Sequence, residues 1–407
     1  MLTVRAWHRL MAAALASAAA LGPLNPAAAA GPAPREDEWW FRTWPIQDKI
    51  WPVTRGGGVT IALLDSGVNA RLPELSGAVL PGADLVDQST DGRVDLDTES
   101  PGHGTATAAQ MVGQGGGSSG YLGVAPGARV LPIRIPETAL TGDVLAKAIT
   151  TAVDRGAKVV NMSFVQDSAM FTPVHCDPQL APAITYALRH DVILVAGAGN
   201  TGDQENGVEQ PASCPGVLGI GALTRQLRPW SKTQRQNYVT LAAPGADLSL
   251  VDKHGVIHGG AGTSSAAGLT SAAIALIRAK NPTMPARVLV QRLFATARPI
   301  GGSGWNERAG FGLIDLVAAI DPAHHPVPAS ASNPLYDAFD RWQGQAASVS
   351  PGPNSSPASP HSAPALRKRS SMSRGLWILV AVITALTSVA LAAGIGIVRF
   401  RRTGRTS

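Results

Sequence analysis

Short apolar runs alternate along this chain with longer Ala-rich stretches. Near-continuous apolar runs at residues 59–64, 158–162, 192–196 and 218–222 are typical of strands that are buried on both faces. Helices are predicted between and after them, at 141–155, 178–190, 265–280 and 285–297. This alternation predicts an α/β fold, in which helices cover both faces of a mostly parallel sheet. Functional groups in such folds gather at the carboxyl ends of the strands.

Both ends of the chain carry membrane signals. Arg5 and Arg9 precede the apolar run 10–21 and small residues around Ala30, which predicts a secretory signal peptide over residues 1–30. An uncleaved anchor is the alternative, although the run is shorter than the roughly 20 residues that a span needs. Residues 376–398 are uncharged and predict one transmembrane helix.

Basic residues flank the predicted helix on both sides, so they do not orient it. Export of the N-terminus would make it a stop-transfer anchor. We then expect a single-pass protein of the cell membrane, with an extracytoplasmic globular region and a cytoplasmic tail at 399–407.

The remaining chain divides by composition. Residues 31–50 form an N-terminal extension and residues 51–322 the globular domain. Residues 323–366 are rich in Pro, Ser, Ala and Asn and are expected to form an unfolded tether, within a linker over 323–375 that has a basic end. Trp39, Trp40 and Trp44 are expected to dock the extension onto the domain, and a partner-binding patch is the alternative.

Charge and cysteine content exclude several function classes. The net charge is +6, but residues 1–34 carry +2 and residues 323–407 carry +7, which leaves −3 for residues 35–322. The basic ends therefore fit membrane topology, and a nucleic-acid partner is not expected. The two cysteines, Cys176 and Cys214, lie in the predicted exported region, so we expect a disulfide and no metal site.

Three short motifs carry candidate chemistry. Asp65 ends the first predicted strand, where a turn or cap residue is the commoner interpretation. His103 lies between two glycines at the start of a predicted helix. Ser264 opens an Ala-rich helix; it could simply be a cap, but the free N–H groups of a first turn can also stabilise an oxyanion.

The order Asp, His, Ser along the chain resembles that of the subtilisin-like serine proteases. The motifs Asp65-Ser-Gly-Val, Gly102-His-Gly-Thr and Gly262-Thr-Ser are similar to the three active-site signatures of that family. The resemblance implies a subtilisin-like three-layer fold, protein or peptide substrates and no cofactor. It implies catalytic roles for Asp65, His103 and Ser264.

Further matches extend this resemblance beyond the three motifs. Ala198-Gly-Asn200 follows a buried strand, where the family carries its oxyanion-hole Asn, which implies that role for Asn200. By the same resemblance, the substrate-binding residues are Ser163, Phe164, Ala198 and Gly199.

The whole-chain layout is similar to that of the mycosins, the membrane-anchored proteases of type VII secretion systems. Residues 35–40, 51–56 and 310–320 also resemble mycosin segments. This implies association with a type VII secretion membrane complex. One alternative is a structural subunit of such a complex in which proteolysis is dispensable, and another is an envelope housekeeping protease without a secretion role.

Some residues depart from the family pattern. Gly268 stands where the family usually has Pro, four residues after the nucleophile. Residues 163–166 lack the two glycines common in the substrate cleft, which predicts a reshaped cleft. The Gly-rich loop 115–120 lacks the side-chain oxygens of a tight calcium site. The acidic residues between 87 and 99 are expected to form a solvated loop face, with a metal or basic-substrate role as the less favoured reading.

Overall fold

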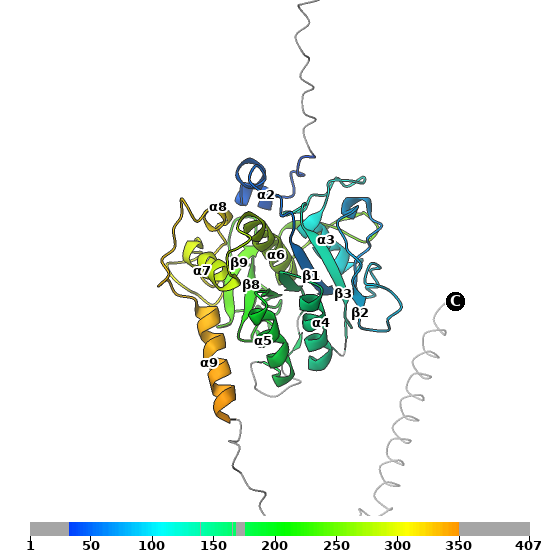
Figure 1. Ribbon diagram of the computed structural model, residues 1–407. Coiled ribbons are helices and arrows are strands. Elements are labelled where there is room, and N and C mark those ends of the chain that lie inside the picture. Colours follow the sequence, from blue (N-terminus) through cyan, green and yellow to red (C-terminus); the bar gives the residue numbers. More distant parts are fainter. Residues whose placement is uncertain (1–31, 139, 165, 168–175, 350–407) are drawn as a thin grey trace, which may run out of the picture. The chain divides into compact units, whose positions relative to one another are not determined.

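The computed structural model of the protein describes residues 32–138, 140–164, 166–167 and 176–349. Its centre is a seven-stranded sheet in the order β2-β3-β1-β4-β6-β8-β9. Every neighbouring pair of these strands runs parallel. The α/β fold with a mostly parallel sheet is therefore confirmed (Figure 1). The strands are β1 Thr60–Asp65, β2 Ala83–Asp84, β3 Arg129–Arg134, β4 Val159–Met162, β6 Ile193–Gly197, β8 Val217–Leu223 and β9 Val239–Pro244.

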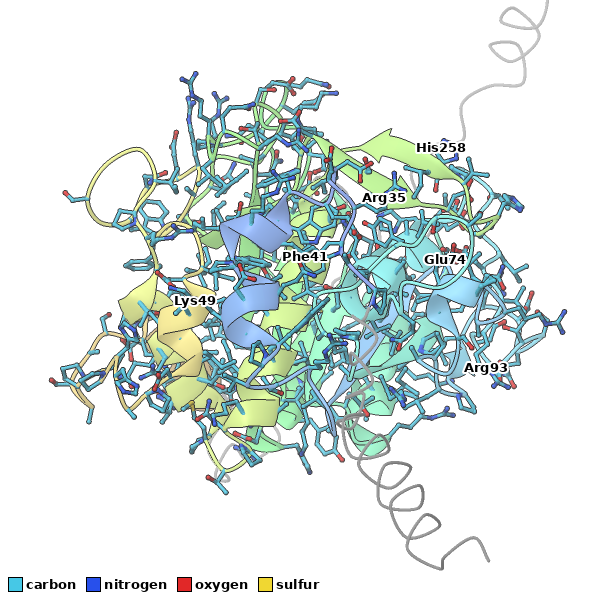
Figure 2. The ribbon with its side chains drawn as sticks, turned by 90° about the horizontal axis from the view of Figure 1, so that it is seen from above. Arg35, Phe41, Lys49, Glu74, Arg93 and His258 are labelled. Carbon is cyan, nitrogen blue, oxygen red and sulfur yellow. A yellow bond between two sulfur atoms is a disulfide. The ribbon has the colours of Figure 1, made fainter. Side chains whose placement is uncertain are left out.

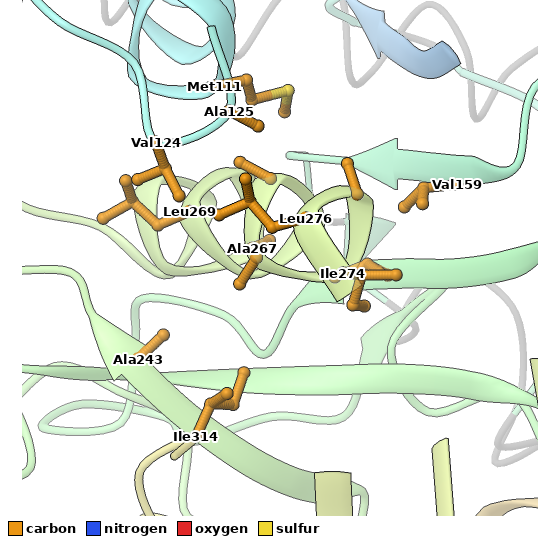
Figure 3. Close-up of a cluster of buried hydrophobic side chains, with 14 of the residues drawn as sticks. Met111, Val124, Ala125, Val159, Ala243, Ala267, Leu269, Ile274, Leu276 and Ile314 are labelled. Carbon is orange, nitrogen blue, oxygen red and sulfur yellow. The ribbon is translucent and has the colours of Figure 1, made fainter. Parts of the chain in front are cut away.

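Helices pack on both faces of this sheet. Side chains alternate along β1: Ile61 and Leu63 join one buried cluster, whereas Ala62 and Leu64 join the other. The first cluster contains α3 (His103–Val112) and α6 (Thr263–Lys280), and the second contains α4 (Gly142–Asp154) and α5 (Ala181–Arg189). Figure 3 shows α6 surrounded by apolar side chains, including Met111 of α3 and Val159 of β4. Helix α6 is buried from Ser265 to Arg278, so Ser264 lies in the first turn of a helix that is held by the core.

The four predicted strands and the four predicted helices are all present. The helix predicted at 178–190 begins with a short 3-10 turn, Pro178–Leu180, and continues as α5. Strands β2, β3 and β9 were not predicted, and β3 carries Pro132 near its middle, a residue that is uncommon inside a strand. Strand β2 pairs with β3 at Ile133 and Arg134, and an isolated bridge joins Val79 to Val130 on the same side, so β3 is paired on both sides of its proline. The other elements are α2 Trp40–Thr43, the π-helical turn Ile46–Ile50, the 3-10 turn Pro73–Leu75, α7 Ala286–Thr296, α8 Leu316–Ile320 and the strands β5 Gln166–Asp167, β7 Glu209–Gln210, β10 Leu248–Val251 and β11 Ile257–Gly260.

One part of the expected tether is folded. Residues Pro334–Val349 form helix α9, which buries Leu335, Tyr336 and Phe339 (Figure 1). The guanidinium carbon of Arg287 on α7 lies 4.4 Å from the Tyr336 ring centroid, and both carboxylate oxygens of Asp340 accept from the same guanidinium. The expectation of an unfolded segment is thus wrong here. Averaging the composition over 323–366 concealed an amphipathic helix ahead of the Pro- and Ser-rich part.

The N-terminal extension docks onto the domain through its tryptophans, as predicted. Trp39, Trp40 and Trp44 are each at most 5% exposed. The indole N–H of Trp39 donates to the carbonyl oxygen of Asp247, and that of Trp44 donates to Ile314, at 3.0 and 2.8 Å. Figure 2 shows the extension crossing one face of the domain, marked by Arg35, Phe41 and Lys49. These contacts join it to residues 200 or more positions away in the chain.

A buried carboxyl also fastens this extension. Glu38 is 1% exposed, and its two oxygens accept hydrogen bonds from the backbone N–H groups of Leu122 and Arg35. Burial raises the pKa of Glu38 to about 7, because desolvation disfavours the charged form.

The predicted disulfide between Cys176 and Cys214 is present. It joins the segment before α5 to the turn before β8, and both cysteines are buried. The bond closes a loop with a sequence separation of 38 residues.

No helix within residues 32–138, 140–164, 166–167 and 176–349 is long and apolar enough to cross a membrane. The predicted signal peptide at 1–30 and the predicted span at 376–398 both lie outside the described residues.

Candidate active site

The predicted site residues meet at one edge of the sheet. Strands β1, β4 and β6 are consecutive and parallel, so their carboxyl ends lie together. The strand order changes direction at β1: β3 pairs with it on one side and β4, the next strand in the chain, pairs with it on the other. Such switch points form crevices in α/β folds. Asp65 ends β1, Ser163 follows β4, and Ala198 follows β6.

Asp65 and His103 form a direct pair. The Nδ1 atom of His103 lies 2.9 and 3.0 Å from the two carboxylate oxygens of Asp65. The Asp65 side chain is 6% exposed and that of His103 is 40% exposed, so one end of the imidazole is open to solvent. The negative charge of Asp65 raises the pKa of His103 above its ordinary value, and the charges of Asp97 and Asp95 act in the same direction.

Glycine is needed beside His103 to allow this approach. A Cβ atom at Gly104 would lie 2.0 Å from the carbonyl oxygen of Gly67, in the loop that follows Asp65. The first turn of α3 therefore contacts the end of β1 backbone to backbone. Any larger residue at 104 would push His103 away from Asp65.

Ser264 is the second residue of α6, and its backbone is fixed by a reciprocal contact. The hydroxyl of Ser264 donates to the carbonyl oxygen of Ser163 at 2.9 Å, while the hydroxyl of Ser163 donates to the carbonyl oxygen of Ser264 at 3.0 Å. Within the described part of the chain, no hydrogen bond joins Ser264 to His103. A rotation of the Ser264 side chain would be needed to make one.

Asn200 presents its amide nitrogen to the same space as the backbone of Ser264. The Oδ1 atom of Asn200 accepts from the backbone N–H and the hydroxyl of Thr263, at 2.9 and 3.0 Å. A Cβ atom placed at Gly262 would lie 3.7 Å from the Ser264 nitrogen and 3.9 Å from Asn200 Nδ2. Two N–H donors therefore border one small volume, which is an arrangement that can stabilise an oxyanion.

The four residues predicted to bind substrate directly follow the carboxyl ends of the neighbouring strands β4 and β6. Ser163 and Phe164 follow β4, and Ala198 and Gly199 follow β6, with Met162 opposite Ala196 in the register. Ser163, Ala198 and Gly199 are buried, and Phe164 is half-buried. Of these, Ser163 contacts Ser264 directly, and Gly199 precedes Asn200 and donates its backbone N–H to the hydroxyl of Thr263.

Two of the acidic residues before His103, Asp95 and Asp97, are functional candidates that sequence reasoning missed. Their neighbours Asp87 and Asp91 lie on a solvated face, as expected, with side chains 54% and 41% exposed. The expectation is wrong for Asp95 and Asp97, which are 6% and 8% exposed. Asp97 accepts a hydrogen bond from the backbone N–H of His103 at 2.8 Å. Gly102 occupies the N-cap position without a side chain, so the need for another acceptor was the available signal.

The unusual Gly268 has a packing role. A Cβ atom at this position would lie 3.0 Å from Cγ2 of Thr107 on α3. The glycine thus lets α6 pack closely on α3, which brings the helices of Ser264 and His103 together.

Comparison with known proteins decides the family. Residues 56–312 match the model of Peptidase_S8, the subtilase family. The chain belongs to the subtilase family. It is 33% identical to Mycosin-3 of Mycobacterium tuberculosis, over 70% of this chain and 73% of the relative. Mycosin-4 of the same organism is 31% identical, over 70% of each chain.

Solved structures agree with this placement. The MycP3 protease from the type VII (ESX-3) secretion system is 31% identical, with a TM-score of 0.59 over 71% of this chain and 89% of that one. A chain of the intact ESX-5 inner membrane complex is 25% identical, with a TM-score of 0.62 and 92% coverage of both chains. The protein is therefore a subtilase-family serine endopeptidase related to the mycosins.

Proposed function

We propose that this protein is a membrane-anchored, extracytoplasmic endopeptidase that uses Asp65, His103 and Ser264 as its catalytic triad. The observation that carries the proposal is the contact of His103 Nδ1 with both oxygens of Asp65, on a helix that packs against α6, the helix that bears Ser264. The proposed reaction is peptide-bond hydrolysis through an acyl-enzyme.

In this mechanism, His103 acts as the base. The Nδ1 proton is held by Asp65, which leaves Nε2 unprotonated and able to accept the hydroxyl proton of Ser264. Ser264 Oγ must first leave the carbonyl of Ser163 and turn toward His103. The oxygen then attacks the substrate carbonyl, and His103 Nε2–H donates the proton to the leaving amine. Water repeats the sequence to release the acyl group.

The developing oxyanion would lie near Gly262. The amide N–H of Asn200 and the backbone N–H of Ser264 border that volume, and Thr263 holds the Asn200 carboxamide in place. Such preorganised donors stabilise charge that develops only in the transition state. Ser163, Phe164, Ala198 and Gly199 are proposed to line the cleft for the substrate.

The test is labelling of the full-length protein with a fluorophosphonate probe. Ser264→Ala and His103→Ala are expected to abolish labelling, because one removes the nucleophile and the other its base. Ser265→Ala is the matched control: it makes the same change one position later on the same helix and should label like the parent protein. Absence of labelling in folded parent protein, or labelling that persists in Ser264→Ala, would contradict the proposed chemistry.

We further propose anchorage by the helix at 376–398 and association with a type VII secretion membrane complex. The support is the uncharged segment in the sequence and the similarity to the MycP3 protease and to the ESX-5 complex chain. Truncation before residue 376 should move the protein from the membrane fraction to the extracytoplasmic soluble fraction. Retention of the truncated protein in membranes after alkaline extraction would contradict the anchor.

A second candidate function is that of a structural subunit of the secretion complex, in which proteolysis is dispensable. It is favoured by the 92% coverage of a chain from an intact inner membrane complex. Replacement of the chromosomal copy by Ser264→Ala separates the two. Normal complex assembly and normal secretion would favour the structural role, whereas assembly without substrate processing would favour the protease.

A further inference from the structure

Asp95 bridges the two segments that carry the proposed Asp65–His103 pair. Its Oδ1 atom accepts from the hydroxyl of Ser66, the residue after Asp65, at 3.0 Å. Its Oδ2 atom accepts from the backbone N–H and the hydroxyl of Thr105, two residues after His103, at 2.9 and 2.5 Å. One buried carboxylate thus joins the end of β1 to the first turn of α3.

The same carboxylate organises the loop between them. Asp95 Oδ1 also accepts from the backbone N–H of Asp97 at 3.1 Å, and Asp97 in turn accepts from the backbone N–H of His103. Lys253, in the turn between β10 and β11, donates to the carbonyl oxygen of Asp97 at 2.7 Å. The loop is therefore held from both sides, and its two carboxylates are acceptors for the start of α3.

We infer that Asp95 is a positioning residue for the proposed triad, which sets the geometry of the Asp65–His103 pair through Ser66 and Thr105 and adds negative charge behind the imidazole. This inference rests on the proposed function. Asp95 acts through neighbouring residues: it accepts from the side-chain hydroxyl of Ser66 and from the backbone N–H and hydroxyl of Thr105.

The electrostatic part of this role follows from the charges around His103. Asp65 contacts the imidazole directly. Asp97 and Asp95 lie in the loop that precedes His103, and the ammonium group of Lys253 contacts this loop at the carbonyl oxygen of Asp97. All three carboxylates favour the protonated imidazole. Loss of one charge should therefore lower the pKa of His103 and make it a functional base at lower pH.

The experiment measures the rate of fluorophosphonate labelling of the full-length protein between pH 5 and 10. Asp95→Asn keeps the side-chain shape, but its amide nitrogen must face a backbone N–H, either of Asp97 or of Thr105. We expect the plateau rate to fall roughly ten- to a hundredfold, as small displacements of catalytic groups do. The acidic limb of the profile should move to lower pH.

Asp84→Asn is the matched control. Asp84 is 5% exposed and accepts hydrogen bonds from Val86, Thr90 and Arg134, but it lies on β2, with β3 between it and β1. Its variant should keep both the plateau rate and the position of the acidic limb. Equal rate losses in both variants would overturn the inference, because a general loss of stability would then explain them.

The outcomes separate this inference from the proposed function. If the folded parent protein does not react with the fluorophosphonate probe, the proposed triad itself is contradicted. Labelling of the parent, with Asp95→Asn unchanged in rate or unchanged in its acidic limb, would overturn the positioning role alone. If Asp95→Asn does not fold, Ser66→Ala decides: it removes the hydroxyl end of the same bridge and should also slow labelling, and a rate like that of the parent would overturn the inference.

Discussion

Stability of the docked N-terminal extension should depend on pH through one residue, Glu38. The carboxyl is 1% exposed and lies between the extension and the backbone of Leu122. Its pKa rises from 4.5 to about 7 in the folded protein, mainly through desolvation, while the backbone N–H donors of Arg35 and Leu122 oppose the rise. The perturbation we consider is Glu38→Gln.

The magnitude follows from this shift. A raised pKa means that the folded state binds the proton more tightly than the unfolded state does. Protonation of Glu38 therefore stabilises the folded state; this contribution is complete below about pH 4.5 and is lost as the pH rises through 7. Since one pKa unit corresponds to about 1.4 kcal/mol, the parent protein should lose about 3 kcal/mol from this group between these limits. Because glutamine does not titrate, Glu38→Gln should lose no free energy of unfolding from this position over the same pH range.

The assay is urea unfolding of residues 32–349 at several pH values between 4.5 and 8.5, followed by tryptophan fluorescence. The quantity to compare is the difference in the free energy of unfolding between Glu38→Gln and the parent, since all other titrating groups cancel in it. The altered hydrogen bonds of Glu38→Gln are expected to lower the free energy of unfolding by the same amount at every pH. The difference itself should shift in favour of glutamine by about 3 kcal/mol across the range.

A control variant makes the result specific. Glu36→Gln changes an exposed carboxyl two residues away in the same extension, and its difference from the parent should stay flat with pH. An equally flat difference for Glu38→Gln would refute the reasoning, because it would mean that the buried carboxyl is not desolvated.

Three further changes test the site and the fold. Asn200→Ala should slow fluorophosphonate labelling by roughly 10²- to 10³-fold with the fold intact, because it removes a side-chain donor to the oxyanion; a rate within threefold of the parent would contradict that role. Replacing Cys176 and Cys214 together by Ser should lower the free energy of unfolding by about 3–4 kcal/mol, measured in urea without reductant, because the loop of 38 residues is then open in the unfolded chain. Phe339→Ala should cost about 3 kcal/mol and expose α9 to limited proteolysis, whereas unchanged protease resistance would show that the helix does not depend on this contact.

The sequence by itself predicted the framework of the sheet. Val160, Leu194 and Leu218 lie in near-continuous apolar runs, and such runs are stable only when both faces of the strand are covered. It did not predict β3, whose Pro132 cannot donate a backbone hydrogen bond; whether a donor is needed there depends on the path of the neighbouring segment, which the residues of β3 do not specify. Helix α9 was missed because its few apolar residues gain stability only from the distant surfaces that they cover, such as α5 beside Phe339 and α7 beside Tyr336.

The same division holds for the site. Asp65, His103 and Ser264 were each a weak signal alone, and they became recognisable through their order along the chain and the resemblance of their motifs to one family. The burial of Asp95 and Asp97 could not be recognised, because an acidic loop is solvated unless a particular set of donors is brought to it from β1 and α3. Local sequence therefore determined which groups are available for chemistry. Only the tertiary structure decided which carboxylates surround His103, since burial of a charge depends on partners supplied by distant parts of the chain.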